Sequence, residues 1–326
     1  MERLPGFTLH RPATLAEALA LLAREPAARP IAGGTDLVPN LRDGLGAPAL
    51  LVDVAGLPGL AAVELAADGG IVVGAGVTLA HLARDATIAA RLPALAAAAA
   101  SVAGPSHRTV ATLGGNLCVD TRCVFYNQSA WWRSANAHCL KHGGDTCHVA
   151  PQGKRCHAAY SGDTAPVLIA LGAEVEIVAA AGTRRIPLEA MYADDGAAPL
   201  ALAPGELVAR VHVPAQAPGA RSGYRKARAR GAIDFPLAGV AARLVQDGNR
   251  VADLRVALTG TNAHPLRVAG TEAFAGASVD EALLAALAKL VQKQAAPMRT
   301  TVTASNWRRS VAAVLARRLV AELAGA

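Results

Sequence analysis

Aromatic residues and long apolar runs are both scarce in this chain. Phe, Trp and Tyr make up 3% of its 326 residues, too few for the stacking platforms on which proteins bind single-stranded nucleic acid. The most apolar stretch, residues 93–104, is followed by Pro105 and falls far short of the roughly 18 apolar residues of a membrane span. The first 20 residues include Glu2, Arg3 and Arg11 and show no apolar core of a secretory signal. We therefore expect a cytoplasmic protein with no membrane span and no nucleic acid partner.

The composition is that of an ordered protein with more than one domain. Hydrophobic residues make up 52% of the chain and charged residues 17%, and the net charge of +7 comes mostly from scattered Arg and Lys. A basic face of this kind could meet an acidic redox partner. A proline- and glycine-rich break at residues 214–219 predicts domains over 1–213 and 220–326. Short predicted strands mixed with helices indicate an α+β fold.

Local patterns predict several elements directly. Thr14 precedes Glu17 by three residues at the start of an apolar helical period, which is typical of a capped helix. The pattern also predicts one helix over 88–102, an extended approach over 105–113, a helix over 161–170 and a strand over 235–245. Residues 118–157 show little periodicity, so this stretch reads as an insertion within the first domain.

Two glycine pairs stand in the first domain, Gly33-Gly34 and Gly114-Gly115. Glycine lets backbone N–H groups approach a phosphate without a Cβ in the way, and Thr35 and Thr112 could add hydroxyl donors. Neither pair fits the dinucleotide-binding or P-loop spacing. Each pair alone is typical of a turn, but the two together behind apolar runs favour a phosphate-binding cradle.

All five cysteines lie between Cys118 and Cys156. In a cytosolic chain this clustering favours metal or redox chemistry over disulfides. The spacing contains no C-x2-C, so it matches neither zinc fingers nor ferredoxins. Four thiolates on one irregular loop can still surround an iron-sulfur cluster, and a mixed Cys/His zinc site remains open. Histidines that could take part in such a zinc site are His107, His138, His142, His148 and His157.

Three motifs resemble, in order and spacing, the FAD motifs of the flavoprotein subunits of the xanthine dehydrogenase and carbon monoxide dehydrogenase family. They are residues 32–37 (AGGTDL), 112–117 (TLGGNL) and 161–166 (SGDTAP), and the resemblance extends to residues 224–226 and 255–260. It implies a two-part FAD-binding domain of the PCMH/vanillyl-alcohol-oxidase-like type, followed by an α+β C-terminal domain of the CO dehydrogenase flavoprotein type.

The resemblance also implies a set of FAD-binding residues. The backbone of the two glycine turns would hold the diphosphate, Asp163 would bond toward the ribityl or adenosine part, and Lys226 with the strand around Leu207 would approach the isoalloxazine. From the residues alone, Asp163 could equally cap a helix and Lys226 could be a solvated lysine. The full predicted set is Arg29, Ile31, Ala32, Gly33, Gly34, Thr35, Asp36, Val102, Thr112, Gly114, Gly115, Asn116, Asp163, Leu207 and Lys226.

The cysteine stretch departs from most flavoprotein subunits of that family. It is similar to the extra loop in the flavin subunit of 4-hydroxybenzoyl-CoA reductase, which carries a 4Fe-4S cluster. That resemblance implies Cys123, Cys139, Cys147 and Cys156 as ligands, with Cys118 as a small buried spare. Phe125, Tyr126, Trp131 and Trp132 would pack over the cluster or anchor the loop.

On this resemblance the chain is an oxidoreductase subunit that transfers electrons and performs no substrate chemistry of its own. Its partners would be a large subunit with the molybdenum cofactor and a small 2Fe-2S subunit, assembled as a dimer of heterotrimers. Reduced ferredoxin would supply electrons for the anaerobic dehydroxylation of 4-hydroxybenzoyl-CoA to benzoyl-CoA. Three alternatives stay open: a related hydroxylase or dehydrogenase that passes electrons outward, a stand-alone flavin oxidoreductase, and a zinc-stabilised binding module.

Overall fold

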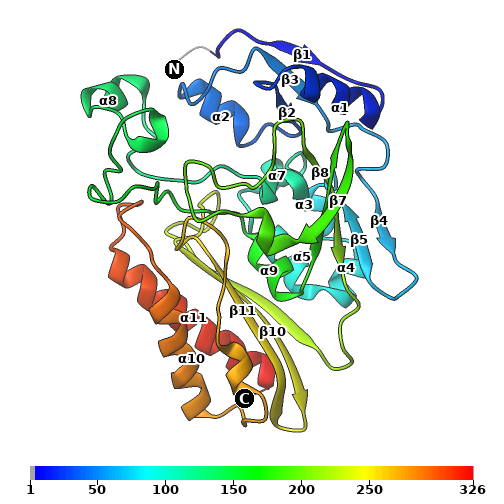
Figure 1. Cartoon of the computed structure of the whole chain (residues 1–326). Helices are drawn as coiled ribbons and strands as arrows, with labels where there is room; N and C mark the ends of the chain where they lie inside the picture. Colours follow the sequence, from blue (N-terminus) through cyan, green and yellow to red (C-terminus); the bar gives the residue numbers. More distant parts are fainter. Residues whose placement is uncertain (1–3, 326) are drawn as a thin grey trace.

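Three β-sheets organise residues 4–325, the part of the chain that this computed structural model describes (Figure 1). A parallel sheet of three strands, in the order β1-β3-β2, lies at the N-terminal end. An antiparallel sheet of five strands follows, in the order β4-β5-β8-β6-β7, and an antiparallel sheet of four strands, β12-β11-β10-β9, forms the C-terminal part.

The N-terminal sheet is built from short strands around one well-capped helix. Helix α1 begins as predicted, because the Glu17 amide donates to Thr14 Oγ1 (3.1 Å) while Glu17 Oε2 accepts from the Ala13 amide (2.8 Å). Buried Ala18, Leu19 and Leu22 pack this helix against the sheet. The elements are β1 (Thr8–His10), α1 (Leu15–Arg24), β2 (Arg29–Ile31), α2 (Leu37–Arg42) and β3 (Leu50–Asp53).

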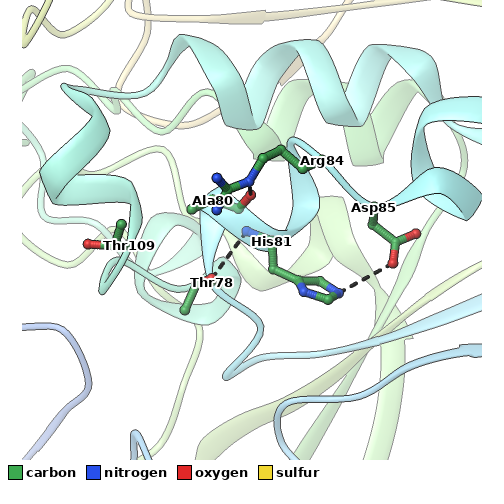
Figure 2. Close-up of a pocket in the computed structure, with 6 residues that line it drawn as sticks. All are labelled: Thr78, Ala80, His81, Arg84, Asp85 and Thr109. Carbon is green, nitrogen blue, oxygen red and sulfur yellow. Dashed lines mark hydrogen bonds and ion pairs between the residues drawn. The ribbon is translucent and has the colours of Figure 1, made fainter.

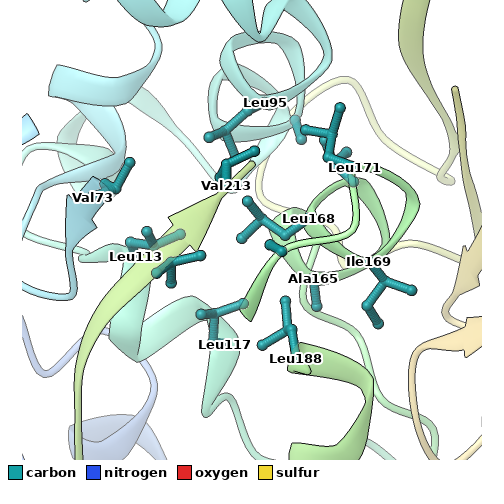
Figure 3. Packing of buried hydrophobic residues seen from close by; sticks show 14 of the residues in the cluster. Val73, Leu95, Leu113, Leu117, Ala165, Leu168, Ile169, Leu171, Leu188 and Val213 are labelled. Carbon is teal, nitrogen blue, oxygen red and sulfur yellow. The ribbon is translucent and has the colours of Figure 1, made fainter. Parts of the chain in front are cut away.

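The five-stranded sheet packs its apolar side chains against a group of short helices. Figure 3 shows this core, where Val73 and Val213 from the sheet meet Leu95, Leu113 and Leu168 from the helices. All five are buried, so the helices that carry the predicted site are fixed on the sheet. The strands are β4 (Val63–Leu65), β5 (Ile71–Gly74), β6 (Glu174–Ala179), β7 (Gly182–Pro187) and β8 (Leu207–Val213). The helices are α3 (Leu79–Leu82), α4 (Ala86–Arg91), α5 (Pro93–Ser101), α6 (Pro105–Arg108), α7 (Leu113–Leu117), α9 (Thr164–Ala170) and the 3-10 helix η2 (Leu188–Met191).

Three local predictions for this region need correction. The helix expected over 88–102 is two helices, because Pro93 cannot continue α4 and instead starts α5. The approach expected to be extended over 105–113 contains α6, which also begins on a proline. The helix expected from residue 161 begins at Thr164.

The C-terminal sheet has both faces covered. Along β10, Ala241 faces the core of the first domain, whereas Val240, Ala242 and Leu244 face the C-terminal helices. This alternation places α5 and α9 on one face and α10 and α11 on the other (Figure 1). The elements are β9 (Arg221–Ala227), β10 (Ala238–Asp247), β11 (Arg250–Thr259), β12 (Leu266–Arg267), η3 (Thr271–Phe274), α10 (Glu281–Gln294) and α11 (Ser305–Ala324). The strand predicted from residue 235 begins at Ala238, after Pro236.

One buried arginine ties α11 to the loops around it. The Arg308 side chain is fully buried and donates to Leu237 O (2.9 Å), Met298 O (3.0 Å) and Gly260 O. Burial lowers the pKa of Arg308 to about 10, because the charged form loses hydration. Through the carbonyl of Thr300, which accepts from the Val124 amide (2.8 Å), this cluster also reaches the cysteine stretch.

The cysteine stretch is mostly loop, as expected. Within it lie only α8 (Ala130–Ala135) and the 3-10 turn η1 (Leu140–His142), and it extends between the N-terminal sheet and the C-terminal helices in Figure 1. Across residues 4–325, none of the helices is long and apolar enough to cross a membrane.

Candidate functional site

The first glycine pair forms a tight turn pressed against the approach to the second. A Cβ on Gly33 would lie far inside 3.0 Å of the Val110 carbonyl, a separation that real Cβ atoms essentially never show. Gly34 takes φ +68°, in the left-handed region that favours glycine. The two turns, more than 70 residues apart in sequence, are therefore adjacent in space, as a two-sided phosphate cradle requires.

The first turn presents unused backbone donors. Among the described residues, no atom accepts a hydrogen bond from the amides of Gly33, Gly34 and Thr35. Successive free N–H groups in a turn of this kind make a concave anion site. The same turn leads into α2, whose N-cap is Asp36. Predicted roles for Arg29, Ile31 and Ala32 stay predictions; these residues form β2 and the start of the turn.

The second glycine pair is built differently, because it lies inside helix α7. Thr112 caps this helix, with its Oγ1 accepting from the Gly115 amide (3.1 Å). The Leu113 and Gly114 amides donate to Val77 O (2.9 Å) and Ala75 O (2.8 Å). Since these donors are already occupied, the first turn is better suited to hold a diphosphate through its backbone. Asn116 instead braces the site, because its Oδ1 accepts from the Thr164 amide (3.0 Å) and hydroxyl (2.7 Å).

Asp163 is buried at the junction of the two domains. Its carboxylate accepts from Tyr224 OH (2.6 Å) and from Lys226 Nζ (3.0 Å), both on strand β9. Asp163 makes no side-chain cap to α9, and the Lys226 side chain is only 5% exposed. Neither the helix cap nor the solvated lysine therefore describes these residues.

The charges of this pair are strained by burial and relieved by pairing. Burial raises the pKa of Asp163 and lowers that of Lys226, since each charged form loses hydration, and their mutual attraction opposes both shifts. Lys226 also donates to the Ser101 carbonyl (3.2 Å), at the C-terminal end of α5. Val102, the C-cap of that helix, therefore lies beside the pair.

Leu207 lies apart from this group. Its side chain is buried in the cluster formed by α1, β3 and β6, with Ala32 at the margin of that cluster. The structure thus places Leu207 near the first glycine turn rather than beside Lys226. Its predicted contact with the cofactor stays a prediction.

A shallow pocket of about 310 Å³ adjoins the second glycine turn (Figure 2). His81 and Asp85 face each other across it at 3.3 Å, and Arg84 folds back onto the Ala80 carbonyl. Thr78 of this pocket is bridged to Thr112. None of the residues predicted from the sequence lines the pocket, so it adds a polar surface next to the predicted cradle.

The four cysteines predicted as ligands line one cavity. Cys123, Cys139, Cys147 and Cys156 are each buried to more than nine-tenths and form no disulfide. Phe125, Tyr126, Leu140, Lys141, His148, Val149 and Ala158 complete the wall. The insertion therefore brings together four thiols that lie up to 33 residues apart in sequence.

Backbone donors surround two of these sulfurs. The Ala158 amide donates to Cys156 Sγ (3.4 Å), and the amides of Phe125 and Tyr126 point at Cys123. Burial raises the pKa of Cys156 to about 12, while this amide and the charge of Lys141 oppose the rise. Amides aimed at cysteine sulfurs are typical of iron-sulfur sites.

The cavity does not have the geometry of a single-ion site. Within residues 4–325, no group of three or more His, Cys, Asp or Glu side chains could hold one metal ion. A cluster of several iron atoms needs its cysteines spread around a larger group, so four thiols lining one cavity is the arrangement it would require. His148 Nε2 and Asn127 Nδ2 are buried here without a hydrogen-bond partner in the described chain.

Predictions for the neighbouring residues hold only in part. Phe125 and Tyr126 line the cavity, and Trp132 lies 6.3 Å from Phe125 between ring centroids. Trp131 is 76% exposed, so its expected packing over a cluster is wrong. Cys118 is half-buried rather than buried.

A polar network joins the cysteine cavity to the first glycine turn. The Asp36 carboxylate pairs with Arg122 and accepts from the Asp120 amide (3.3 Å), and Asp120 in turn pairs with Lys141 (2.6 Å). Arg122 directly precedes Cys123, and Lys141 follows Cys139 by two residues. Lys141 was not among the predicted residues; only its place between two cysteines could have drawn attention to it.

Arg133 anchors the arm that carries α8. Its buried guanidinium donates to Asp43 O (2.6 Å), Gly44 O (3.3 Å) and Gln128 O. We expect Arg133→Met to destabilise the arm by about 3 kcal/mol, because several carbonyls lose their donor. Chymotrypsin should then cleave faster after exposed Trp131. Exposed Arg42→Met is the control and should leave the cleavage rate unchanged; an unchanged rate in both variants would contradict the anchor.

Comparison with known proteins agrees with this architecture. Residues 5–216 match the model of the FAD binding domain in molybdopterin dehydrogenase, and residues 222–323 match the CO dehydrogenase flavoprotein C-terminal domain. The chain belongs to this flavoprotein family. The predicted fold, an FAD-binding domain of the PCMH type followed by a CO dehydrogenase flavoprotein C-terminal domain, is therefore confirmed, and the chain is an oxidoreductase subunit.

Relatives of this flavoprotein cover nearly its full length. The aldehyde oxidoreductase FAD-binding subunit of Escherichia coli is 35% identical over 82% of this chain and 85% of its own. The xanthine dehydrogenase FAD-binding subunit of Escherichia coli is 28% identical over 97% and 96%. Among solved structures, Cu,Mo-CO dehydrogenase superposes with a TM-score of 0.82 at 25% identity over 99% of both chains. Quinoline 2-oxidoreductase from Pseudomonas putida 86 gives 0.79 at 26% identity, over 99% and 98%.

Proposed function

We propose that this flavoprotein carries a 4Fe-4S cluster in addition to FAD and relays electrons between them. The observation that carries the proposal is the single cavity lined by Cys123, Cys139, Cys147 and Cys156. Sulfur-only ligation with amide donors suits an iron-sulfur cluster, and the absence of a three-ligand single-ion geometry within residues 4–325 disfavours zinc.

The chain's own residues would divide the work between two sites. The free amides of Gly33, Gly34 and Thr35 would hold the diphosphate of FAD, and Gly115 and Asn116 would form the opposite wall. When bound, FAD takes one or two electrons and a cluster takes one at a time, so the pair would couple one-electron and two-electron chemistry. The four cysteines would hold the cluster, while Phe125 and Tyr126 exclude water from it.

The wider assignment is the medium subunit of a molybdenum-containing reductase of the 4-hydroxybenzoyl-CoA reductase type. Support comes from the cysteine insertion, which the sequence analysis matched to that enzyme's flavin subunit. Relatives named medium chains or subunits belong to carbon monoxide dehydrogenase and nicotine 6-hydroxylase, so a large molybdenum subunit and a small 2Fe-2S subunit are the expected partners. Ferredoxin would be the electron donor.

A second candidate is outward electron flow in a related hydroxylase or dehydrogenase. The names of the relatives favour it, because they are dehydrogenases, hydroxylases and oxidoreductases. The two candidates differ in which reaction the purified complex performs. Thioester dehydroxylation driven by a low-potential donor supports the reductase, whereas substrate oxidation with an added acceptor supports outward flow.

The decisive experiment is anaerobic purification followed by iron, sulfide, zinc and FAD analysis, with EPR of the reduced protein. We expect about four iron atoms and one FAD per chain. Cys139→Ser should abolish the cluster signal and keep the flavin. Cys118→Ser is the matched control, because Cys118 does not line the cavity, and it should keep both cofactors. Zinc without iron would overturn the cluster proposal.

A further inference from the structure

Lys141 holds a buried ammonium group in the wall of the cysteine cavity. The residue sits in the 3-10 turn η1, which follows Cys139, and its side chain is only 5% exposed. Its Nζ lies 4.3 Å from the centre of the Tyr126 ring, so the charge faces an aromatic surface on one side. Burying an ammonium group is costly, so its place beside four thiols calls for an explanation.

The contacts of Lys141 hold it in one position. Nζ donates to Asp120 Oδ1 (2.6 Å), Thr121 Oγ1 (2.5 Å) and Thr121 O (3.2 Å). These three bonds satisfy all three ammonium hydrogens. Its counter-ion, Asp120, is 30% exposed, so water screens the carboxylate more than the ammonium. The net field at the cavity is therefore positive on this side.

Other charges near the cavity are compensated elsewhere. Arg122 pairs with Asp36 in the first glycine turn, and the guanidinium of Arg133 is spent on backbone carbonyls. On the opposite wall, Asp195 accepts from the Cys156 amide, so its carboxylate lies behind the ligand rather than in the cavity. Lys141 is the cation whose side chain lines the cavity among the residues that the structure describes.

We propose that Lys141 raises the reduction potential of the cluster bound by these four cysteines. The inference rests on the proposed cluster. A cluster held by four thiolates is anionic and gains one more negative charge when it accepts one electron. A fixed positive charge at low dielectric stabilises the reduced form more than the oxidised form. Lys141 thus acts through the field at the cluster, and it makes no bond to the iron.

The test is an EPR-monitored redox titration of the full-length protein in its purified complex. Lys141→Met keeps the volume and removes the charge, so we expect the reduction equilibrium to fall at least about tenfold, equivalent to about 59 mV for one electron. Asp120→Asn removes the counter-charge and should shift the potential in the opposite direction. Lys154→Met is the matched control: Lys154 is exposed and two residues from Cys156, and its removal should leave the potential unchanged.

A purely structural role for Lys141 would not give shifts of opposite sign. Equal potentials in wild type, Lys141→Met and Asp120→Asn, each with about four iron atoms, would overturn the inference and leave the cluster intact. If Lys141→Met fails to hold iron, Lys141→Arg and Asp120→Asn decide: an unchanged potential in Asp120→Asn overturns the proposal. A wild-type protein without iron would instead overturn the proposed function, so the two failures are distinguishable.

Discussion

Replacing Gly33 by alanine should cost the protein its flavin. The added Cβ would collide with the backbone carbonyl of Val110, and a backbone atom cannot swing away as a side chain can. The first glycine turn would have to move away from the second, which would open the cradle between them. We expect FAD affinity to fall by more than tenfold and stability by about 2–3 kcal/mol, in the range of overpacked sites.

The measurement is bound FAD per purified chain, together with thermal unfolding of the protein stripped of flavin. Gly56→Ala is the matched control, because a Cβ there would meet no atom within 4 Å. It should keep full flavin and the wild-type midpoint. A Gly33→Ala protein with full FAD and unchanged stability would show that the two turns do not form one site. Loss of flavin with wild-type apoprotein stability would place the effect in the cradle alone.

Local signals in the sequence predicted local structure well. The helix cap at Thr14 and Glu17 depends only on residues three apart, so it could be read directly. Pro93 was a similar signal that the prediction of one helix over 88–102 overlooked. The glycine pairs were predicted to be turns, but whether their amides are free depends on distant partners. The Gly114 amide is occupied by Ala75, a contact that exists only once the five-stranded sheet has formed.

The same distinction applies to the candidate site. Clustering of the cysteines in sequence indicated a shared site, because an irregular loop of about 40 residues can bring them together. Charge around that site could not be read in this way. Arg122 and Lys141 lie beside cysteines in sequence, but their partners Asp36 and Asp120 reach them from other segments. Pairing of Lys226 with Asp163 across the domain boundary is likewise a product of tertiary packing.

Breaking the buried pair of Asp163 and Lys226 should destabilise the junction between the domains. Lys226→Met leaves a carboxylate that is 3% exposed without its cation, and Asp163→Asn leaves an ammonium that is 5% exposed without its anion. Each change should cost about 3–5 kcal/mol, as expected when one partner of a buried ion pair is removed. The double variant should cost clearly less than the sum, because neither charge is then left alone. Exposed Lys289→Met is the control and should change stability by less than about 0.5 kcal/mol.

The pH dependence gives the sign of the remaining charge. In Lys226→Met, burial raises the pKa of Asp163 with no nearby ammonium of Lys226 to oppose it. A carboxyl with a raised folded pKa binds its proton more tightly in the folded state, so its contribution is present at low pH and is lost as the pH rises through that value. Chemical unfolding at pH 5 and pH 8 should therefore show Lys226→Met losing more stability at the higher pH than wild type does. Asp163→Asn/Lys226→Met, which carries neither group, should not show this extra loss. An equal loss in the single and double variants would mean that Asp163 does not carry the charge at this junction, and that Tyr224 and the surrounding backbone hold β9 against α5 and α9.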